Sequence, residues 1–322
     1  MFEKYNALLQ PLDAIKLNFN EAGLMVMNIT IAFIMFGVAL GIKRENFLQI
    51  TKNPKSVIIG LLAQFLLLPA ITYLLVILLK FPVSISLGML LVASCPGGNV
   101  SNFMTSMAKG NVALSVTLTA FSDLLSILMT PLNFVFWSEL YISTVPLAHP
   151  IEIPWEHVFQ TIIILMGIPL VVGLWFARRF PKITEKIVKP VKWISVIAFL
   201  GFIAGAVIAN FGHFMNYFLL LIPIVLVHNA IAFGIGNGIA RASFLSVLDR
   251  KTITIETGIQ NSGIALVLIF NKHIFPDGYG GIAFIAAMWG IWHIASGLLL
   301  STWWAKYTKK HPIKAVENNL QN

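Results

Sequence analysis

The chain is poor in charged residues and nearly free of cysteine. Charged residues make up 11% of its 322 residues, whereas hydrophobic residues make up 57%. This composition excludes an ordinary soluble globular domain. The one cysteine, Cys95, excludes an internal disulfide and a cysteine metal cluster. Neither a His-Glu-x-x-His nor a Gly-x-Ser-x-Gly pattern occurs in the sequence, so we predict that the protein is not an enzyme and uses no cofactor.

Apolar stretches long enough to cross a membrane fill most of the chain, each of about 20 residues. They predict an all-α polytopic membrane protein with nine transmembrane helices in a single domain, residues 1–322. Residues 1–23 form the predicted extracellular N-terminal segment, residues 24–305 the membrane region and residues 306–322 the cytoplasmic tail. The predicted spans are 24–42, 56–79, 85–107, 112–138, 155–177, 191–210, 216–240, 252–271 and 279–305.

The orientation follows from the basic residues. Alternate loops hold 18 of the 22 Lys and Arg residues, and the remaining four (Lys4, Lys16, Lys80 and Lys272) lie on the opposite side. Because Lys and Arg gather in cytoplasmic loops, the bias predicts a cell-membrane protein with an outside N-terminus and a cytoplasmic C-terminus. The net charge of +9 therefore indicates membrane topology rather than nucleic-acid binding.

Two polar, glycine-containing stretches interrupt the apolar pattern. The first runs from Ser94 to Asn102 in the third span and includes Pro96, and the second runs from Glu256 to Gly263 in the eighth. Proline and glycine break helices, and unwound backbone at membrane depth has to be buried in protein or line a wet cavity. Pairing spans 1–4 with spans 6–9 superposes the two breaks and predicts an inverted repeat, the pattern of secondary transporters. The alternative is that both are packing kinks.

Only two acidic residues, Asp123 and Glu256, fall in the interior of apolar spans. A carboxylate near the bilayer centre costs at least about 2.5–3.5 kcal/mol on insertion scales. Since the interiors of the spans contain no Lys or Arg to neutralise it, a bound cation is the natural counter-charge for Glu256, and Na⁺ favours oxygen ligands. A protonated Glu256 bonded within the core is the alternative interpretation.

The fourth span carries hydroxyl groups at helical spacing. Together with Ser101 and Asn102 of the first break, they predict an oxygen cage for a small cation. The competing interpretation is hydrogen bonding to neighbouring helices or to their own backbone. The hydroxyl-bearing residues of this stripe are Ser115, Thr119, Ser122 and Ser126.

These motifs resemble those of the bile acid:sodium symporter family. The resemblance rests on Cys95–Asn102, on Lys109–Ser115, on Glu256–Gly263, and on Gln64 with Pro69 in the second span. It covers about residues 24–305. It implies core and panel domains, two discontinuous crossing helices, and two Na⁺ as coupling ions. The first implied sodium site comprises Ser101, Asn102, Ser115, Thr119 and Glu256, and the second comprises Gln64, Glu256 and Gln260 with the carbonyls of Thr257 and Ile259.

Three residues are predicted to contact the substrate: Asn99 and Asn261 after the breaks, and His293 in the last span. Asn99 occupies a position that is often Thr in bacterial relatives. Asp123 stands where relatives carry an uncharged residue, so we assign it a modulating role at the first sodium site. His228-Asn229 is interpreted as packing, as is the run Gly234-Ile235-Gly236-Asn237-Gly238.

The predicted function is sodium-coupled import of an organic anion by alternating access. Bile acids, steroid conjugates and small hydroxy acids such as pantoate fit the predicted site equally well. Proton-coupled transport or exchange is the alternative within transport, because of Asp123. A sensor that binds without transporting is the alternative from another class, and a flux assay separates it from a transporter.

Overall fold

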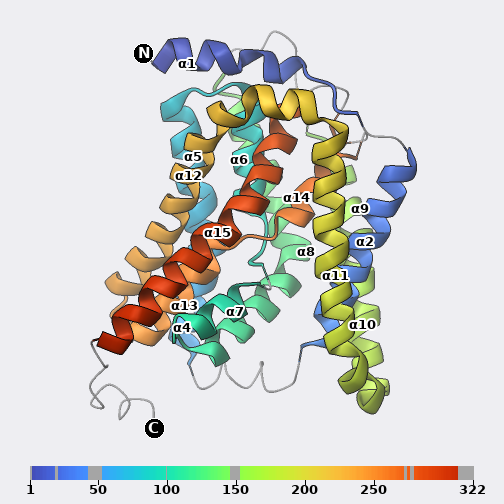
Figure 1. Ribbon diagram of the computed structural model, residues 1–322, viewed down its shortest axis with the longest axis vertical. Helices are drawn as coiled ribbons and strands as arrows, with labels where there is room; N and C mark the ends of the chain where they lie inside the picture. The colour runs from blue at the N-terminus through green and yellow to red at the C-terminus, as the bar shows by residue number, and fades with distance from the viewer. Residues whose placement is uncertain are drawn as a thin grey trace.

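The computed structural model describes residues 2–18, 21–42, 53–98, 100–145, 153–271, 274–275 and 279–310. Within these ranges the protein is helical, and most of the long helices lie roughly along one axis (Figure 1). The long unbroken helices are α2 (Glu21–Leu40), α8 (Val112–Ile142), α11 (Pro181–Ala209), α12 (Phe211–Ala242) and α15 (Gly280–Lys310).

The remaining elements are shorter. They are α1 (Phe2–Leu9), η1 (Gln10–Ala14), α4 (Pro54–Leu62), η2 (Ala63–Leu67), α5 (Leu68–Leu79), α6 (Val83–Ser94), α7 (Val100–Met107), α9 (Trp155–Ile162), η3 (Ile163–Gly167), α10 (Ile168–Arg179), α13 (Val247–Gly258) and α14 (Ser262–Ile269). The segments α4–η2–α5 and α9–η3–α10 each form one continuous helix.

Length and apolar composition qualify six helices in the described ranges as membrane spans. They are Ala22–Leu40, Pro54–Leu79, Val112–Ile142, Trp155–Arg179, Phe211–Ala242 and Gly280–Lys309. The predicted all-α architecture is therefore confirmed, and six of the nine predicted spans match such helices. The other three predicted spans correspond to α6 with α7, to α11, and to α13 with α14. Helix α11 begins at Pro181, ten residues before the predicted span, because the basic stretch that precedes residue 191 is also helical.

Each of the two composite helices contains one π-helical turn just before a proline. Turn η2 precedes Pro69, and turn η3 precedes Pro169. A proline lacks the amide that would bond the carbonyl four residues earlier, so the helix widens there instead of ending. The first widened turn carries Gln64, whose side chain is buried.

Both predicted breaks are present. Helix α6 ends at Ser94 and α7 begins at Val100, while α13 ends at Gly258 and α14 begins at Ser262. In Figure 1, α6 and α14 occupy the upper half of the molecule, and α7 and α13 occupy the lower half. The two interrupted helices therefore meet at their breaks near mid-height.

The two unwound segments satisfy each other's backbone groups. The Gly98 amide donates to the Ile259 carbonyl at 2.8 Å, and the Asn261 amide donates to the Pro96 carbonyl at 2.8 Å. Gly97 and Gln260 form the antiparallel bridge between these bonds. Buried peptide groups without partners are costly, so this pairing is what allows the helices to unwind here.

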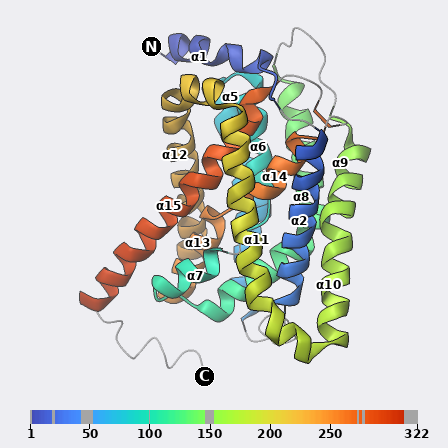
Figure 2. The ribbon, with the colours of Figure 1, turned by 45° about the vertical axis from the view of Figure 1, so that its right-hand side comes forward.

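The helices outside the crossing include a group of three beside it and the N-terminal helix across one end. Helix α2 packs against α10 and α11. These three helices stand at the right of the molecule in Figure 1, and in Figure 2 α11 comes to the front with α2 and α10 to its right. The N-terminal helix α1 lies across the upper end of the bundle. Beyond it, the Asp13 carboxylate accepts hydrogen bonds from the amides of Val83 (3.2 Å) and Ser84 (2.8 Å) and so caps the start of α6.

Helices α12 and α13 approach each other closely at Gly236. A Cβ atom at this position would lie 2.8 Å from the Ile253 carbonyl oxygen and 2.9 Å from the Thr254 Cα atom. At Gly234 and Gly238 of the same helix a Cβ would meet nothing within 4 Å. The packing interpretation of this glycine run is therefore supported at Gly236, whereas its two flanking glycines are exposed.

We expect Gly236→Ala to lower the melting temperature of the detergent-solubilised protein, because its methyl group would press on backbone atoms that cannot rotate away. Overpacking of this kind costs about 1–3 kcal/mol. Gly234→Ala and Gly238→Ala are the matched controls and should melt close to the wild type. Equal destabilisation by all three substitutions would contradict the close approach at Gly236.

Candidate functional site

Glu256 stands at the centre of a polar cluster beside the crossing. It lies on the last turns of α13, and its side chain is 2% exposed. The Ser101 hydroxyl donates to its Oε1 atom at 2.6 Å, and the Ser115 hydroxyl donates to the same atom. The Thr119 hydroxyl lies 3.2 Å from both carboxylate oxygens. Helices α7, α8 and α13 thus direct oxygen atoms at one point.

Two further side chains extend this cluster along α7. The Asn102 Oδ1 atom lies 3.4 Å from the Thr119 hydroxyl, and the Thr105 hydroxyl lies 3.2 Å from that of Ser115. Thr105 is fully buried and follows Ser101 by one helical turn. Thr105 was not among the residues predicted from the sequence, although its spacing from Ser101 is the signal that would have found it.

The predicted hydroxyl stripe of α8 reaches Glu256 only in its first half. Ser115 and Thr119 contact the carboxylate, whereas Ser122 donates to the Thr119 carbonyl at 3.1 Å and Ser126 to the Asp123 carbonyl at 2.8 Å. For the latter two, backbone bonding within α8 is therefore the correct interpretation. The predicted cage does not extend to them.

A second group of amide oxygens and nitrogens lies on the other side of Glu256. A Cβ atom on Gly97 would sit 2.9 Å from Gln64 Nε2 and 3.1 Å from Glu256 Oε2, so these side chains converge on the first break. Gln260 Nε2 donates to the Thr257 carbonyl at 2.9 Å. Gln64 Nε2 and Gln260 Oε1 are among the buried side-chain atoms of the described residues that have no hydrogen-bond partner.

Such unpartnered groups are rare in protein interiors, because a buried polar atom without a partner gives up its hydrogen bonds to water and gains none in return. The assignment of nitrogen and oxygen within a glutamine amide follows its surroundings, so either end of Gln64 fits a ligand in this space. The Ile259 carbonyl faces the Gly98 amide and retains one lone pair. Of the sequence-predicted second group, Gln64 and Glu256 thus meet at Gly97, which pairs with Gln260 through the backbone.

Of the three residues predicted to contact the substrate, the structure describes two. Asn99 lies outside the described residues. Asn261 is half-buried at the start of α14, and its side chain does not cap that helix. His293 is 4% exposed on α15, and its carbonyl oxygen lies 3.2 Å from the Ser296 hydroxyl. Asp123 is fully buried on α8, one helical turn after Thr119.

Of the two residues interpreted as packing, only His228 is adequately described in that way. Its Nε2 atom lies 2.8 Å from the Thr72 hydroxyl, and its ring meets the Trp289 ring edge-on with centroids 4.7 Å apart. Asn229 instead donates from Nδ2 to the Gly258 carbonyl at 2.7 Å, directly at the second break. The packing interpretation of Asn229 was therefore incomplete.

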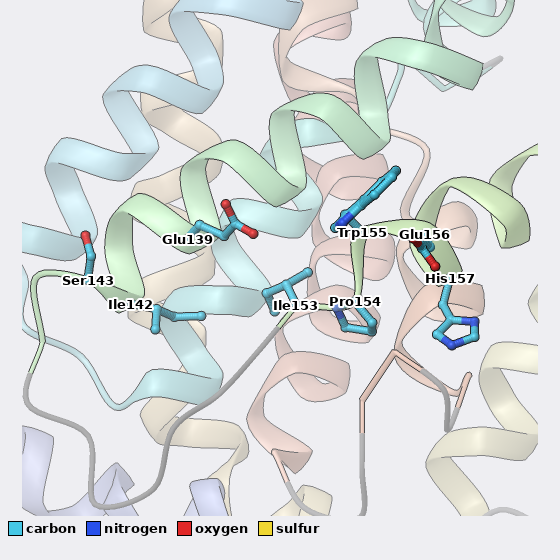
Figure 3. Close-up of a pocket in the computed structure, with 8 residues that line it drawn as sticks. All are labelled: Glu139, Ile142, Ser143, Ile153, Pro154, Trp155, Glu156 and His157. Carbon is cyan, nitrogen blue, oxygen red and sulfur yellow. The ribbon is translucent and has the colours of Figure 1, made fainter.

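A separate hollow of about 570 Å³ lies where α8 ends and α9 begins, away from the crossing (Figure 3). Its polar lining includes Glu139, Glu156 and His157, all of which are exposed. It shares no residue with the Glu256 cluster.

Comparison with known proteins identifies the family. The sequence pattern of the Sodium Bile acid symporter family matches residues 28–217. The chain is 32% identical over 294 residues to a Bacillus subtilis protein named Uncharacterized sodium-dependent transporter YocS, covering 91% of this chain and 87% of that protein. It is 23% identical to the human ileal sodium/bile acid cotransporter, covering 89% of this chain and 80% of the human protein. It is 27% identical to the bovine sodium-dependent organic anion transporter, covering 76% of this chain and 63% of the bovine protein.

The chain therefore belongs to the sodium bile acid symporter family, which confirms the resemblance found in its motifs. It is a multi-pass membrane protein of a sodium-dependent transporter family rather than an enzyme.

Proposed function

We propose that the protein is a sodium-coupled symporter that imports an organic anion by alternating access. The observation that carries this proposal is the fully enclosed Glu256 carboxylate, which three hydroxyl groups approach beside two unwound helices. Lys251 is on the same helix, but its ammonium donates to the Ala108 carbonyl and to the Thr308 hydroxyl instead. A bound cation is the counter-charge that fits a carboxylate in this environment.

The first proposed sodium ion would be held by Glu256 with side-chain oxygens of α7 and α8. Hydroxyl and amide oxygens are the ligands that hard cations prefer. In the structure the hydroxyls donate to Glu256, and they would turn a lone pair toward an ion seated among them. The proposed ligands are Ser101, Asn102, Ser115, Thr119 and Glu256.

The second proposed sodium ion would lie on the other side of Glu256, near Gly97. The buried amide ends of Gln64 and Gln260 that have no partner support this site. Glycine at position 97 leaves the space between Gln64 and Glu256 open. The proposed ligands are Gln64, Glu256 and Gln260 with the carbonyl oxygens of Thr257 and Ile259.

The substrate we propose is a monovalent organic anion such as a bile acid, a steroid conjugate or a small hydroxy acid like pantoate. Helices α7 and α14 start at the breaks, and free amides at helix starts favour anions. Asn99, Asn261 and His293 are the proposed contacts. Two Na⁺ entering with one such anion carry one net positive charge inward, to which the membrane potential contributes about 2.3 kcal/mol per 100 mV.

Alternating access requires two bodies that move relative to each other. We propose that α2, α9–α10 and α11 form a panel and that the remaining spans form a core. The proposed inverted repeat pairs spans 1–4 with spans 6–9, so the panel holds one span from each repeat (α2 and α11) together with the unpaired fifth span (α9–α10). The opposite chain directions of the two interrupted helices support this repeat. The proposed topology has nine spans in the cell membrane, with the N-terminus outside and the C-terminus in the cytoplasm.

We expect Na⁺ to raise the melting temperature of the purified protein and K⁺ to leave it unchanged at equal ionic strength, because a ligand that binds the folded state stabilises it. Glu256→Ala should abolish the Na⁺ effect, since one carboxylate serves both proposed sites. Equal shifts with both cations, or full Na⁺-dependent uptake by the variant, would refute the sodium assignment.

Asp123 favours a second candidate function, proton-coupled transport, because it places another buried carboxylate one turn from the first site. If it only modulates that site, Asp123→Thr should retain Na⁺ stabilisation. The Na⁺ affinity of this variant should fall less steeply as the pH is lowered, because the Asp123 carboxylate can no longer bind a proton in competition with Na⁺. Complete loss of Na⁺ binding would instead make Asp123 a primary ligand.

We expect Asn261→Ala to weaken anion binding and to leave Na⁺ stabilisation largely intact. The crossing bond at this position comes from the Asn261 backbone amide, which alanine retains, and only the side chain is lost. A thermal-shift screen identifies an anion that binds, and calorimetry then measures Na⁺ and anion affinities in the variant. Equal loss of both affinities would show that Asn261 supports the crossover itself.

A further inference from the structure

The carbonyl group of Gly258 is held by a side chain that the proposed sodium sites do not use. Asn229 is fully buried on α12, and its Nδ2 atom donates to the Gly258 carbonyl at 2.7 Å. Its Oδ1 atom accepts a hydrogen bond from the Ser296 hydroxyl of α15 at 2.6 Å. The Gly258 carbonyl can only accept a hydrogen bond, so it faces the nitrogen end of the Asn229 amide. The Ser296 hydroxyl can donate one, so it faces the oxygen end, and the two partners together fix the orientation of the amide.

Three successive carbonyl groups at the second break have partners from three different places. Thr257 O accepts from the Gln260 side chain, Gly258 O from Asn229, and Ile259 O from the Gly98 amide across the crossing. Unwound backbone has no helical bonds to orient its peptide groups. The bond from Asn229 fixes the peptide group that lies between the Thr257 and Ile259 carbonyls, and these are the two proposed to bind sodium.

Helix α12 offers a rigid base for this contact. The Phe233 ring lies so close that a Cβ atom on Gly258 would sit 2.2 Å from two of its carbons, and Gly236 touches the backbone of α13 one turn further on. Asn229, Phe233 and Gly236 follow the i, i+4, i+7 spacing of one helix face. Asn229 therefore cannot move relative to Gly258 without disturbing the whole seam between α12 and α13.

Helix α15 contacts the same break directly. A Cβ atom on Gly297 would lie 2.7 Å from Ile259 Cδ1 and 2.4 Å from Met104 Sδ, so α15 presses against both interrupted helices. Ser296 precedes this glycine and is half-buried. The hydroxyl of Ser296 thus joins α15 to Asn229 at the level of the crossing.

We propose that Asn229 is a positioning residue for the second sodium site, and that Ser296 acts on that site through Asn229. The bridge Ser296–Asn229–Gly258 holds the peptide group between Thr257 and Ile259 so that both carbonyls stay aimed at the ion, and it makes sodium affinity depend on the position of α15. This inference rests on the proposed function.

The test is a Na⁺ titration of the thermal stabilisation of the purified full-length protein, at constant ionic strength with choline as the replacing cation. We expect Asn229→Ala to raise the half-saturating Na⁺ concentration about tenfold and Ser296→Ala about threefold, within the range typical of coupled sites. The double variant should match Asn229→Ala alone, because residues that act through one another are not additive.

Asn237→Ala is the matched control. Asn237 lies two turns further along α12, and its Nδ2 atom bonds the Thr254 hydroxyl at 3.2 Å, away from the break. This variant should keep the wild-type half-saturation even if it melts earlier.

A lower melting temperature with unchanged half-saturation in Asn229→Ala would overturn the proposal, and so would additive effects in the double variant. If Asn229→Ala does not fold, an unchanged half-saturation in Ser296→Ala overturns it. If Na⁺ does not change the melting temperature of the wild-type protein, the proposed function is refuted, and this inference with it.

Discussion

The short antiparallel pairing between the two unwound segments is the contact on which the rest of the site depends. Two backbone hydrogen bonds, Gly98 to Ile259 and Asn261 to Pro96, replace the helical bonds that Pro96 and the glycines remove. Without them, each break would expose peptide groups in a region where water cannot satisfy them. Because the bonds run between backbones, they hold the two helices in one register whatever side chains surround them.

That register decides which side chains meet. Glu256 lies two residues before the α13 break and Ser101 lies just after the α7 start, so pairing the breaks brings the carboxylate to the hydroxyl. Helix α8 then adds Ser115 and Thr119 from the side. An acid surrounded by hydroxyl groups suits a transiently bound cation, since each oxygen already has a partner when the ion is absent. This property is consistent with an ion that must bind and leave in every cycle.

Much of this arrangement was predictable from the sequence, because its causes are local. Proline and glycine in apolar stretches predicted both breaks, and the scarcity of intramembrane acids singled out Glu256. The i, i+4 spacing predicted the hydroxyl stripe, but spacing alone did not show that Ser122 and Ser126 would bond their own backbone. That choice depends on how far along α8 the neighbouring helix α7 reaches, which is a tertiary property.

The roles that the sequence did not reveal belong to residues whose partners are distant in the chain. Asn229 bonds a carbonyl 29 residues away and a hydroxyl 67 residues away, and no periodicity marks such a pairing. The N-terminal residues were expected only as an extracellular segment. There, Asp13 caps α6 from 70 residues away. Local patterns identify elements and breaks, whereas these contacts follow from how the elements are placed.

The central claim is that the crossing of two broken helices builds sodium sites around Glu256. The most direct measurement is a high-resolution experimental density map of the protein prepared in Na⁺, compared with one prepared in K⁺. We predict density for ions on both sides of the Glu256 carboxylate in Na⁺ only, with the Ser101, Ser115 and Thr119 hydroxyls turned toward the first ion. Identical maps in the two salts, with the hydroxyls bonded only to the carboxylate, would contradict this account.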